Sequence, residues 1–119
     1  MTRSVLVVDD DPVFRRLARR MLTGGGFDVV GEADTLAAAM EIVHVVRPDA
    51  VLVDVGLPDG DGVTLAEYLA ALPWRPRVLL TSTDPDAASP ADVRRSGAGG
   101  FVAKDELPNA PLRTLLADA

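Results

Sequence analysis

The sequence predicts an α/β fold: a doubly wound, five-stranded parallel sheet with helices on both faces. Five short apolar segments, rich in β-branched residues, alternate with longer segments in which apolar residues recur at helical spacing. The short segments are apolar almost throughout, as expected for parallel strands that helices cover on both sides. The expected strands are Arg3–Val8, Phe27–Gly31, Asp49–Val53, Val78–Leu80 and Gly100–Ala103.

Local signals mark the first helix between these strands. Asp11 precedes Pro12, the arrangement of an N-cap followed by proline at the first helical position. The glycines that begin at Gly24 are expected to end this helix. Its apolar stripe is expected to contain Val13, Phe14, Leu17, Ala18, Met21 and Leu22.

The later helices follow the same pattern. Asp34 or Thr35 is expected to cap the second helix, and a loop rich in Gly, Pro and Asp precedes a helix near residues 63–72. Ser89 begins a capping-box pattern at the start of a short helix. The last helix is expected over residues 109–117.

Length, composition and charge limit the classes of protein. The chain has 119 residues, the length of one domain, and we expect residues 1–119 to form a single one. Its net charge of −6, without a basic stripe, argues against direct nucleic-acid binding by this domain. Cysteine is absent from the sequence, and no apolar run approaches the length of a membrane span. We therefore expect a cytoplasmic protein that does not bind membranes.

Polar residues stand at the carboxyl ends of four expected strands. In a parallel sheet these ends meet at one edge, where binding sites form. Crowded carboxylates repel one another unless a cation neutralises them, and oxygen ligands suit Mg²⁺. A lysine and hydroxyl groups could bind an arriving anion, so the set is typical of metal-assisted phosphoryl transfer. The residues are Asp9, Asp10, Asp11, Asp54, Thr81, Ser82 and Lys104.

Four segments of the chain, in order and at matching spacing, resemble the receiver (phosphoacceptor) domain of bacterial two-component response regulators. The resemblance covers essentially the whole chain. It implies a flavodoxin-like sheet with strand order 2-1-3-4-5. The segments are Val7–Asp11, Val51–Pro58 with Asp61–Gly62, Leu79–Ser82 and Gly100–Lys104.

The resemblance implies a role for each of these strand ends. Asp54 would be the phosphoacceptor for a sensor histidine kinase, a phosphotransfer protein or a small phosphodonor. Thr81 and Lys104 would act as further catalytic residues that contact the phosphoryl oxygens. Asp11 is better explained as a helix cap. The cofactor would be Mg²⁺, bound by Asp9, Asp10, Asp54 and the backbone carbonyl of Gly56.

The resemblance also implies a conformational switch. Phe101 occupies the position of an aromatic residue that turns inward when the Thr81 hydroxyl moves to the phosphoryl group. A role as an ordinary core residue is an equal alternative. The output partner, which the sequence does not identify, would bind the face formed by the fourth helix, the fifth strand and the fifth helix. A homodimer through this face is a further alternative.

The sequence departs from the family pattern in two places. Lys104 is followed by Asp105, where many members have proline preceded by a cis bond, so this feature is in question here. Gly56 brings no side chain that could steer water onto an acyl phosphate, which predicts slow self-dephosphorylation. The chain is expected to be either a stand-alone receiver or a piece of a longer regulator.

A degenerate receiver that binds proteins without phosphorylation is the main alternative function. Such domains usually lack one of Asp10, Asp54, Thr81 and Lys104, which are all present here. A phosphohydrolase would need a substrate pocket and a second acid. We therefore expect no enzyme activity beyond the chain's own phosphorylation and dephosphorylation.

Overall fold

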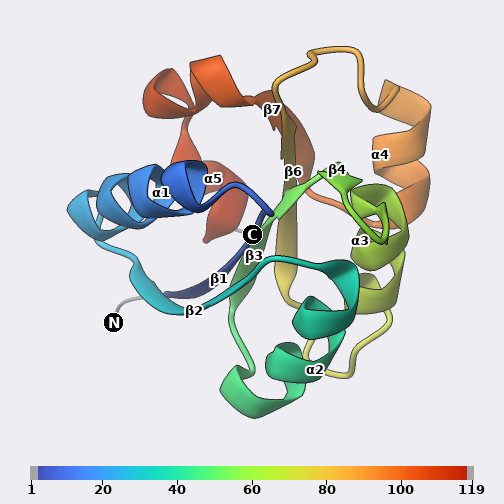
Figure 1. Cartoon of the computed structure of the whole chain (residues 1–119), viewed down its shortest axis with the longest axis horizontal. Helices are drawn as coiled ribbons and strands as arrows, with labels where there is room; N and C mark the ends of the chain where they lie inside the picture. Colours follow the sequence, from blue (N-terminus) through green and yellow to red (C-terminus); the bar gives the residue numbers. More distant parts are fainter. Residues whose placement is uncertain (1–2, 118–119) are drawn as a thin grey trace.

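Five parallel strands form the central sheet of the protein (Figure 1). The computed structural model describes residues 3–117. The strands are β1 (Ser4–Val8), β2 (Asp28–Ala33), β3 (Ala50–Asp54), β6 (Arg77–Ser82) and β7 (Gly100–Ala103). Their order is β2-β1-β3-β6-β7, and every neighbouring pair is parallel. Counted along the chain, this is the order 2-1-3-4-5, so the predicted doubly wound sheet is confirmed.

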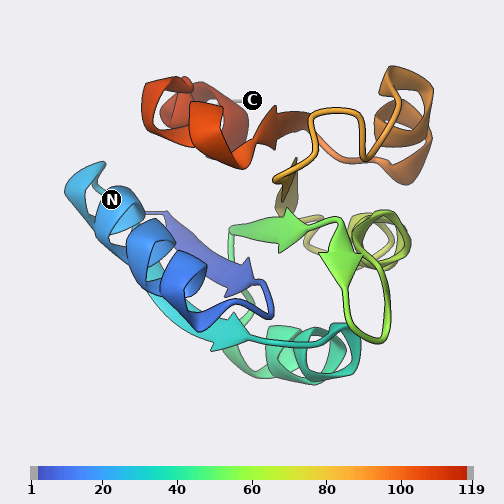
Figure 2. The same ribbon diagram turned by 45° about the horizontal axis from the view of Figure 1, so that its top comes forward.

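Helices cover both faces of this sheet (Figure 2). One face is covered by α1 (Pro12–Gly24), the 3₁₀ helix η1 (Lys104–Asn109) and α5 (Leu112–Leu116). The other is covered by α2 (Leu36–Val46), α3 (Gly62–Ala70) and α4 (Pro90–Ser96). None of the helices between residues 3 and 117 has both the length and the apolar character needed to cross a membrane.

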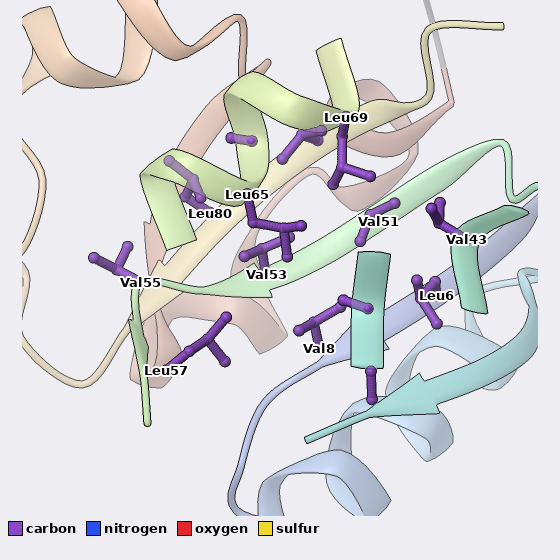
Figure 3. Close-up of a cluster of buried hydrophobic side chains, with 14 of the residues drawn as sticks. Leu6, Val8, Val43, Val51, Val53, Val55, Leu57, Leu65, Leu69 and Leu80 are labelled. Atoms are coloured by element: carbon purple, nitrogen blue, oxygen red, sulfur yellow. The ribbon is translucent and has the colours of Figure 1, made fainter. Parts of the chain in front are cut away.

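Two apolar cores, one on each face of the sheet, hold the layers together. Along β1, Val5 and Val7 belong to the core under α1, whereas Leu6 and Val8 belong to the core under α2 and α3. This alternation arises because successive side chains of a strand point to opposite faces. Figure 3 shows the second core, in which Leu65 of α3 is fully buried above the sheet.

The helices α1, α2 and α4 begin at predicted capping residues. Asp11 accepts a hydrogen bond from the backbone N–H of Val13 at 2.9 Å, and Pro12 occupies the first helical position of α1. Thr35, and not Asp34, caps α2. Ser89 forms a reciprocal capping box at the start of α4. These bonds satisfy backbone donors that the first helical turn leaves without partners.

The apolar stripe predicted for the first helix is wrong in part. Ala18 and Leu22 are buried, but Val13 and Leu17 are 56% and 60% exposed. A helix on the surface of a domain buries only one side of its circumference. On α1 the buried side contains Ala18 and Leu22. Val13 and Leu17 lie beside it on the helix surface and are exposed to solvent.

The helix predicted over residues 109–117 is shorter than expected. Its first part is irregular, and α5 covers only Leu112–Leu116. Pro108 lies inside η1, and Pro111 is the N-cap residue of α5. Proline has no backbone N–H and its ring clashes with the preceding helical turn, so η1 and α5 cannot join into one helix.

Candidate functional site

The carboxyl ends of β1 and β3 bring three aspartates together. Asp9 and Asp10 follow β1, and Asp54 is the last residue of β3, the strand that pairs with β1. One carboxylate oxygen from each of the three residues lies within 4.8 Å of the others. Asp9 and Asp54 are buried, whereas Asp10 is exposed. The fourth predicted acid, Asp11, is bonded to the start of α1 and does not belong to this cluster.

Asp9 is held tightly by the backbone around it. Its N–H donates to the Ala33 carbonyl at 3.0 Å, and its Oδ1 accepts the N–H of Asp11 at 2.9 Å. Its own carbonyl accepts a hydrogen bond from Arg15 Nη1 at 2.6 Å. The second carboxylate oxygen, Oδ2, is buried and has no hydrogen-bond partner among residues 3–117. The nearest charged group to this oxygen is the ammonium of Lys104.

Lys104 brings a positive charge to the cluster from the end of β7. Its ammonium nitrogen lies 2.7 Å from Asp9 Oδ2, off the direction of a hydrogen bond, and 3.7 Å from Asp54 Oδ2. It also lies 4.2 Å from the centre of the Phe14 ring, which is a cation–π contact. The peptide bond to Asp105 is trans. One ammonium faces three carboxylates, so the site keeps an excess of negative charge.

Asp54 has an environment that disfavours its ionised form. Burial and the neighbouring carboxylate of Asp9 raise the pKa of Asp54 above its ordinary value, and Asp10 adds to this effect. Lys104 and a hydrogen bond from the Gly56 N–H, 3.2 Å long, act in the opposite direction without cancelling it. A cation bound beside these acids would favour their ionised forms.

Thr81 lies next to Asp54 in the sheet. The two residues are paired in the β3–β6 register. Thr81 is fully buried, and its hydroxyl has no hydrogen-bond partner in the described part of the chain. A buried unpaired hydroxyl is costly, so this donor is available to an anion at Asp54. Thr81 and Ser82 belong to β6 itself and do not follow it as predicted, and Ser82 Oγ accepts the N–H of Asp84 at 3.1 Å.

The predicted loop after Asp54 contains a small antiparallel hairpin. It consists of β4 (Gly56–Leu57) and β5 (Gly60–Asp61). At its base the Gly62 N–H donates to the Val55 carbonyl at 2.7 Å. At its tip the Asp59 carboxylate accepts the N–H groups of Leu36 and Ala37 at 2.7 and 3.0 Å, at the start of α2. Both contacts fix the backbone of Gly56, whose carbonyl is the predicted metal ligand.

Phe101 lies on β7, away from this cluster. It is half-buried and packs against the core under α3 and α4. With Val93 and Arg94 of α4 it lines an open hollow of about 700 Å³. Its role as a switch remains a prediction, because a half-buried position is compatible with either proposed role.

The donor set fits a hard divalent cation such as Mg²⁺. All candidate ligands are oxygens, which Mg²⁺ prefers, and the buried Asp9 Oδ2 is paired with the Lys104 ammonium alone among residues 3–117. The residues that the sequence did not indicate are Arg15, Phe14 and Asp59. Phe14 and Asp59 make contacts between elements distant in the sequence, and Arg15 is oriented by Glu32 on another strand, so no local pattern marks them.

Comparison with known proteins assigns the chain to a family. The family model for the response regulator receiver domain matches residues 5–115. The chemotaxis protein CheY of Bacillus subtilis is 30% identical over 104 residues, which cover 87% of both chains. The DNA-binding transcriptional activator DevR/DosR of Mycobacterium tuberculosis is 42% identical over 103 residues, 85% of this chain and 47% of that protein.

Solved structures agree with these matches. The receiver domain of the response regulator NarL from Mycobacterium tuberculosis is 38% identical and superposes with a TM-score of 0.78, covering 91% of this chain and 88% of that one. CheY4 of Vibrio cholerae, 23% identical, supports the fold alone, with a TM-score of 0.82 over 97% of both chains. The chain spans about half the length of the first curated regulators that it matches, 49% and 51%. By sequence, strand order and the acidic cluster at the strand ends, the chain belongs to the response regulator receiver domain family.

Proposed function

We propose that this chain is the phosphoacceptor domain of a two-component system and that Asp54 receives the phosphoryl group. An Asp54 carboxylate oxygen attacks the phosphorus of a phosphohistidine on a sensor histidine kinase or phosphotransfer protein, or of a small phosphodonor. The bond from phosphorus to the donor atom breaks as the new P–O bond forms, which leaves an acyl phosphate. The observation that carries this proposal is the position of Asp54 between two further acids and an ammonium group.

The surrounding residues would each act on the phosphoryl group or its charge. Asp9, Asp10, Asp54 and the Gly56 carbonyl would hold Mg²⁺, which when bound would neutralise the acids and the incoming phosphate. The Lys104 ammonium, 3.7 Å from Asp54 Oδ2, would make a charge-assisted hydrogen bond to a phosphoryl oxygen. The Thr81 hydroxyl, which has no partner in residues 3–117, would donate to another.

The proposed output is a change of shape at the face formed by α4, β7 and α5. Movement of the Thr81 hydroxyl toward the phosphoryl group would favour an inward position of Phe101. A partner protein or a second copy of the chain would bind this face. The net charge of −6 does not favour nucleic-acid binding by this domain.

In this proposal the chain forms one cytoplasmic domain, which serves alone or as part of a longer regulator. It catalyses only its own phosphorylation and dephosphorylation and acts on no separate substrate. Gly56 carries no side chain that could guide water, so the acyl phosphate should persist for longer than seconds.

Intact mass measurement after incubation with acetyl phosphate and Mg²⁺ tests the proposal. We expect one phosphoryl adduct in the wild type, and none in Asp54→Asn or in the presence of EDTA. Asp28→Asn, at an exposed aspartate on β2, is the matched control and should be phosphorylated normally. An adduct that persists in Asp54→Asn would refute the assignment of the acceptor. If neither acetyl phosphate nor a panel of purified kinases gives an adduct, the chain is instead a phosphorylation-independent binding module.

A further inference from the structure

Arg15 of α1 contacts the acidic site through the backbone. Its Nη1 donates to the carbonyl of Asp9 at 2.6 Å, and its Nε donates to Glu32 Oε1 on β2 at 3.0 Å. The Arg15 side chain is only 19% exposed. The other carboxylate oxygen, Glu32 Oε2, accepts a hydrogen bond from Arg19 Nε at 2.9 Å. These contacts join α1, β2 and the end of β1.

The shape of the guanidinium group gives the Asp9 contact a fixed direction. Its N–H donors lie in one plane, so the bond from Nε to Glu32 sets the orientation of Nη1. Although burial raises the pKa of Glu32, its hydrogen bonds with Arg19 and Arg15 outweigh this effect and hold the pKa below the ordinary value. Glu32 is therefore charged near neutral pH and can anchor Arg15. Hydrogen bonds from a charged donor are stronger than neutral ones.

The contact bears on the turn that presents two of the three acids. Asp9 and Asp10 lie between the end of β1 and the start of α1, and Arg15 lies one turn into that helix. We infer that Arg15 is a positioning residue for the metal site, because its bond to the Asp9 carbonyl keeps the Asp9 and Asp10 carboxylates within reach of Asp54. This inference rests on the proposed binding of Mg²⁺.

Charge and positioning predict opposite effects of removing Arg15. Arg15 is a cation beside a site for a cation, so loss of its charge alone would strengthen Mg²⁺ binding. Loss of its bond to Asp9 would weaken binding, because the acids would have to be ordered when the metal arrives. Weaker binding after Arg15 is neutralised therefore cannot come from the charge.

Arg19 provides a matched control on the same helix. It binds the same Glu32 carboxylate and carries the same charge, but its other contact is the Val29 carbonyl at 3.3 Å. Its hydrogen bonds do not include Asp9. Arg19→Gln thus removes a charge and an ion pair with Glu32 but leaves the hydrogen bond from Arg15 to the Asp9 carbonyl in place.

Calorimetric titration of the full chain with Mg²⁺, at a temperature where all variants are folded, tests the inference. We expect Arg15→Gln to raise the Mg²⁺ dissociation constant about tenfold, equivalent to about 1.4 kcal/mol. Arg19→Gln should stay within about twofold of the wild type, a difference of about 0.4 kcal/mol. If Arg15→Gln binds Mg²⁺ as tightly as Arg19→Gln or more tightly, Arg15 does not position the site.

A second pair of variants covers the case in which Arg15→Gln does not fold. Arg15→Lys and Arg19→Lys keep the charge but lose the planar fork, and urea denaturation without Mg²⁺ verifies that each is folded. Arg15→Lys should bind Mg²⁺ more weakly than Arg19→Lys, and equal affinities would overturn the inference. A wild-type chain that binds no Mg²⁺ would refute the proposed metal site, and this inference with it. A wild type that binds Mg²⁺ with the affinity of the Arg15 variants refutes the inference alone.

Discussion

Replacing Gly62 with alanine should destabilise the protein and disturb the loop that follows Asp54. Gly62 is the first residue of α3, and a Cβ atom there would overlap the Asp54 carbonyl oxygen and lie 2.8 Å from Val55 Cα. Both neighbours are backbone atoms, so no side-chain rotation can relieve the contact. The change must separate α3 from the end of β3.

The size of the effect follows from these contacts. Non-bonded carbon atoms have their optimum separation at about 3.5–4.0 Å, so the contact with Val55 Cα must lengthen by roughly 0.7 Å. Overpacking of this kind costs about 1–3 kcal/mol, and weakening of the bond from the Gly62 N–H to Val55 costs about 0.5–1.5 kcal/mol more. The higher helix propensity of alanine offsets up to about 1 kcal/mol of this destabilisation. Together these effects give a net loss of about 0.5–4.5 kcal/mol in the free energy of unfolding, with a central value of about 2.5 kcal/mol.

Urea denaturation followed by circular dichroism measures this loss, and Gly24→Ala is the control. Gly24 ends α1 in open space, with no atom within 4 Å of a Cβ there, so alanine should leave stability unchanged or raise it by up to about 1 kcal/mol. Gly62→Ala should also weaken Mg²⁺ binding, because Gly56 belongs to the displaced hairpin. A Gly62→Ala variant within about 0.5 kcal/mol of the wild type would show that the close approach of α3 to Asp54 is incorrect.

Ser89→Ala should lower the free energy of unfolding by about 1 kcal/mol in urea denaturation, because it removes a capping bond of α4. Hydrogen bonds from the N–H groups of Ala37 and Leu36 lower the pKa of Asp59 in the folded protein. These bonds therefore stabilise the fold fully at pH values above the pKa of Asp59 in the unfolded chain. The stabilisation is lost as the pH falls through the pKa of Asp59 in the folded protein. Urea titrations from about pH 6 to about pH 2 should therefore show a smaller loss of stability in Asp59→Asn than in the wild type. Mg²⁺ at 100 times its dissociation constant should stabilise the wild type by about 2.7 kcal/mol in thermal denaturation, and Asp10→Asn should lose most of this gain.

The sheet and the place of the site were predictable because both depend on local signals. Apolar strands such as Val5–Val8 and Ala50–Val53 can only be buried on both sides, which requires a parallel sheet between helices. Once the strands are known, the polar residues at their ends must lie on one edge. Asp9, Asp54 and Lys104 come together for this reason alone.

The contacts between elements that are distant in the sequence were not predictable. The width of the buried stripe on α1 depends on how the helix packs, so Val13 and Leu17 could not be told from their buried neighbours. Arg15 looks like any exposed arginine until Glu32, on the next strand, orients it. His44 has no evident partner in the sequence, yet its ring nitrogen lies 2.6 Å from the Tyr68 hydroxyl of α3. Such pairs are set by tertiary packing, on which sequence spacing carries no information.

The attachment of Asp59 to α2 also limits which insertions the chain can accept. The segment from Gly56 to Gly62 is bonded at its base to Val55 and at its tip to the start of α2, 23 residues earlier in the chain. One added residue would flip the hairpin pairing and carry the Asp59 carboxylate away from the helix. The segment Thr83–Pro85 is exposed, and its side-chain hydrogen bonds are local: Ser82 Oγ accepts the Asp84 N–H, and Asp84 Oδ1 accepts the Asp86 N–H. Changes of length, including engineered peptide tags, should therefore be tolerated after β6 and rejected after β3.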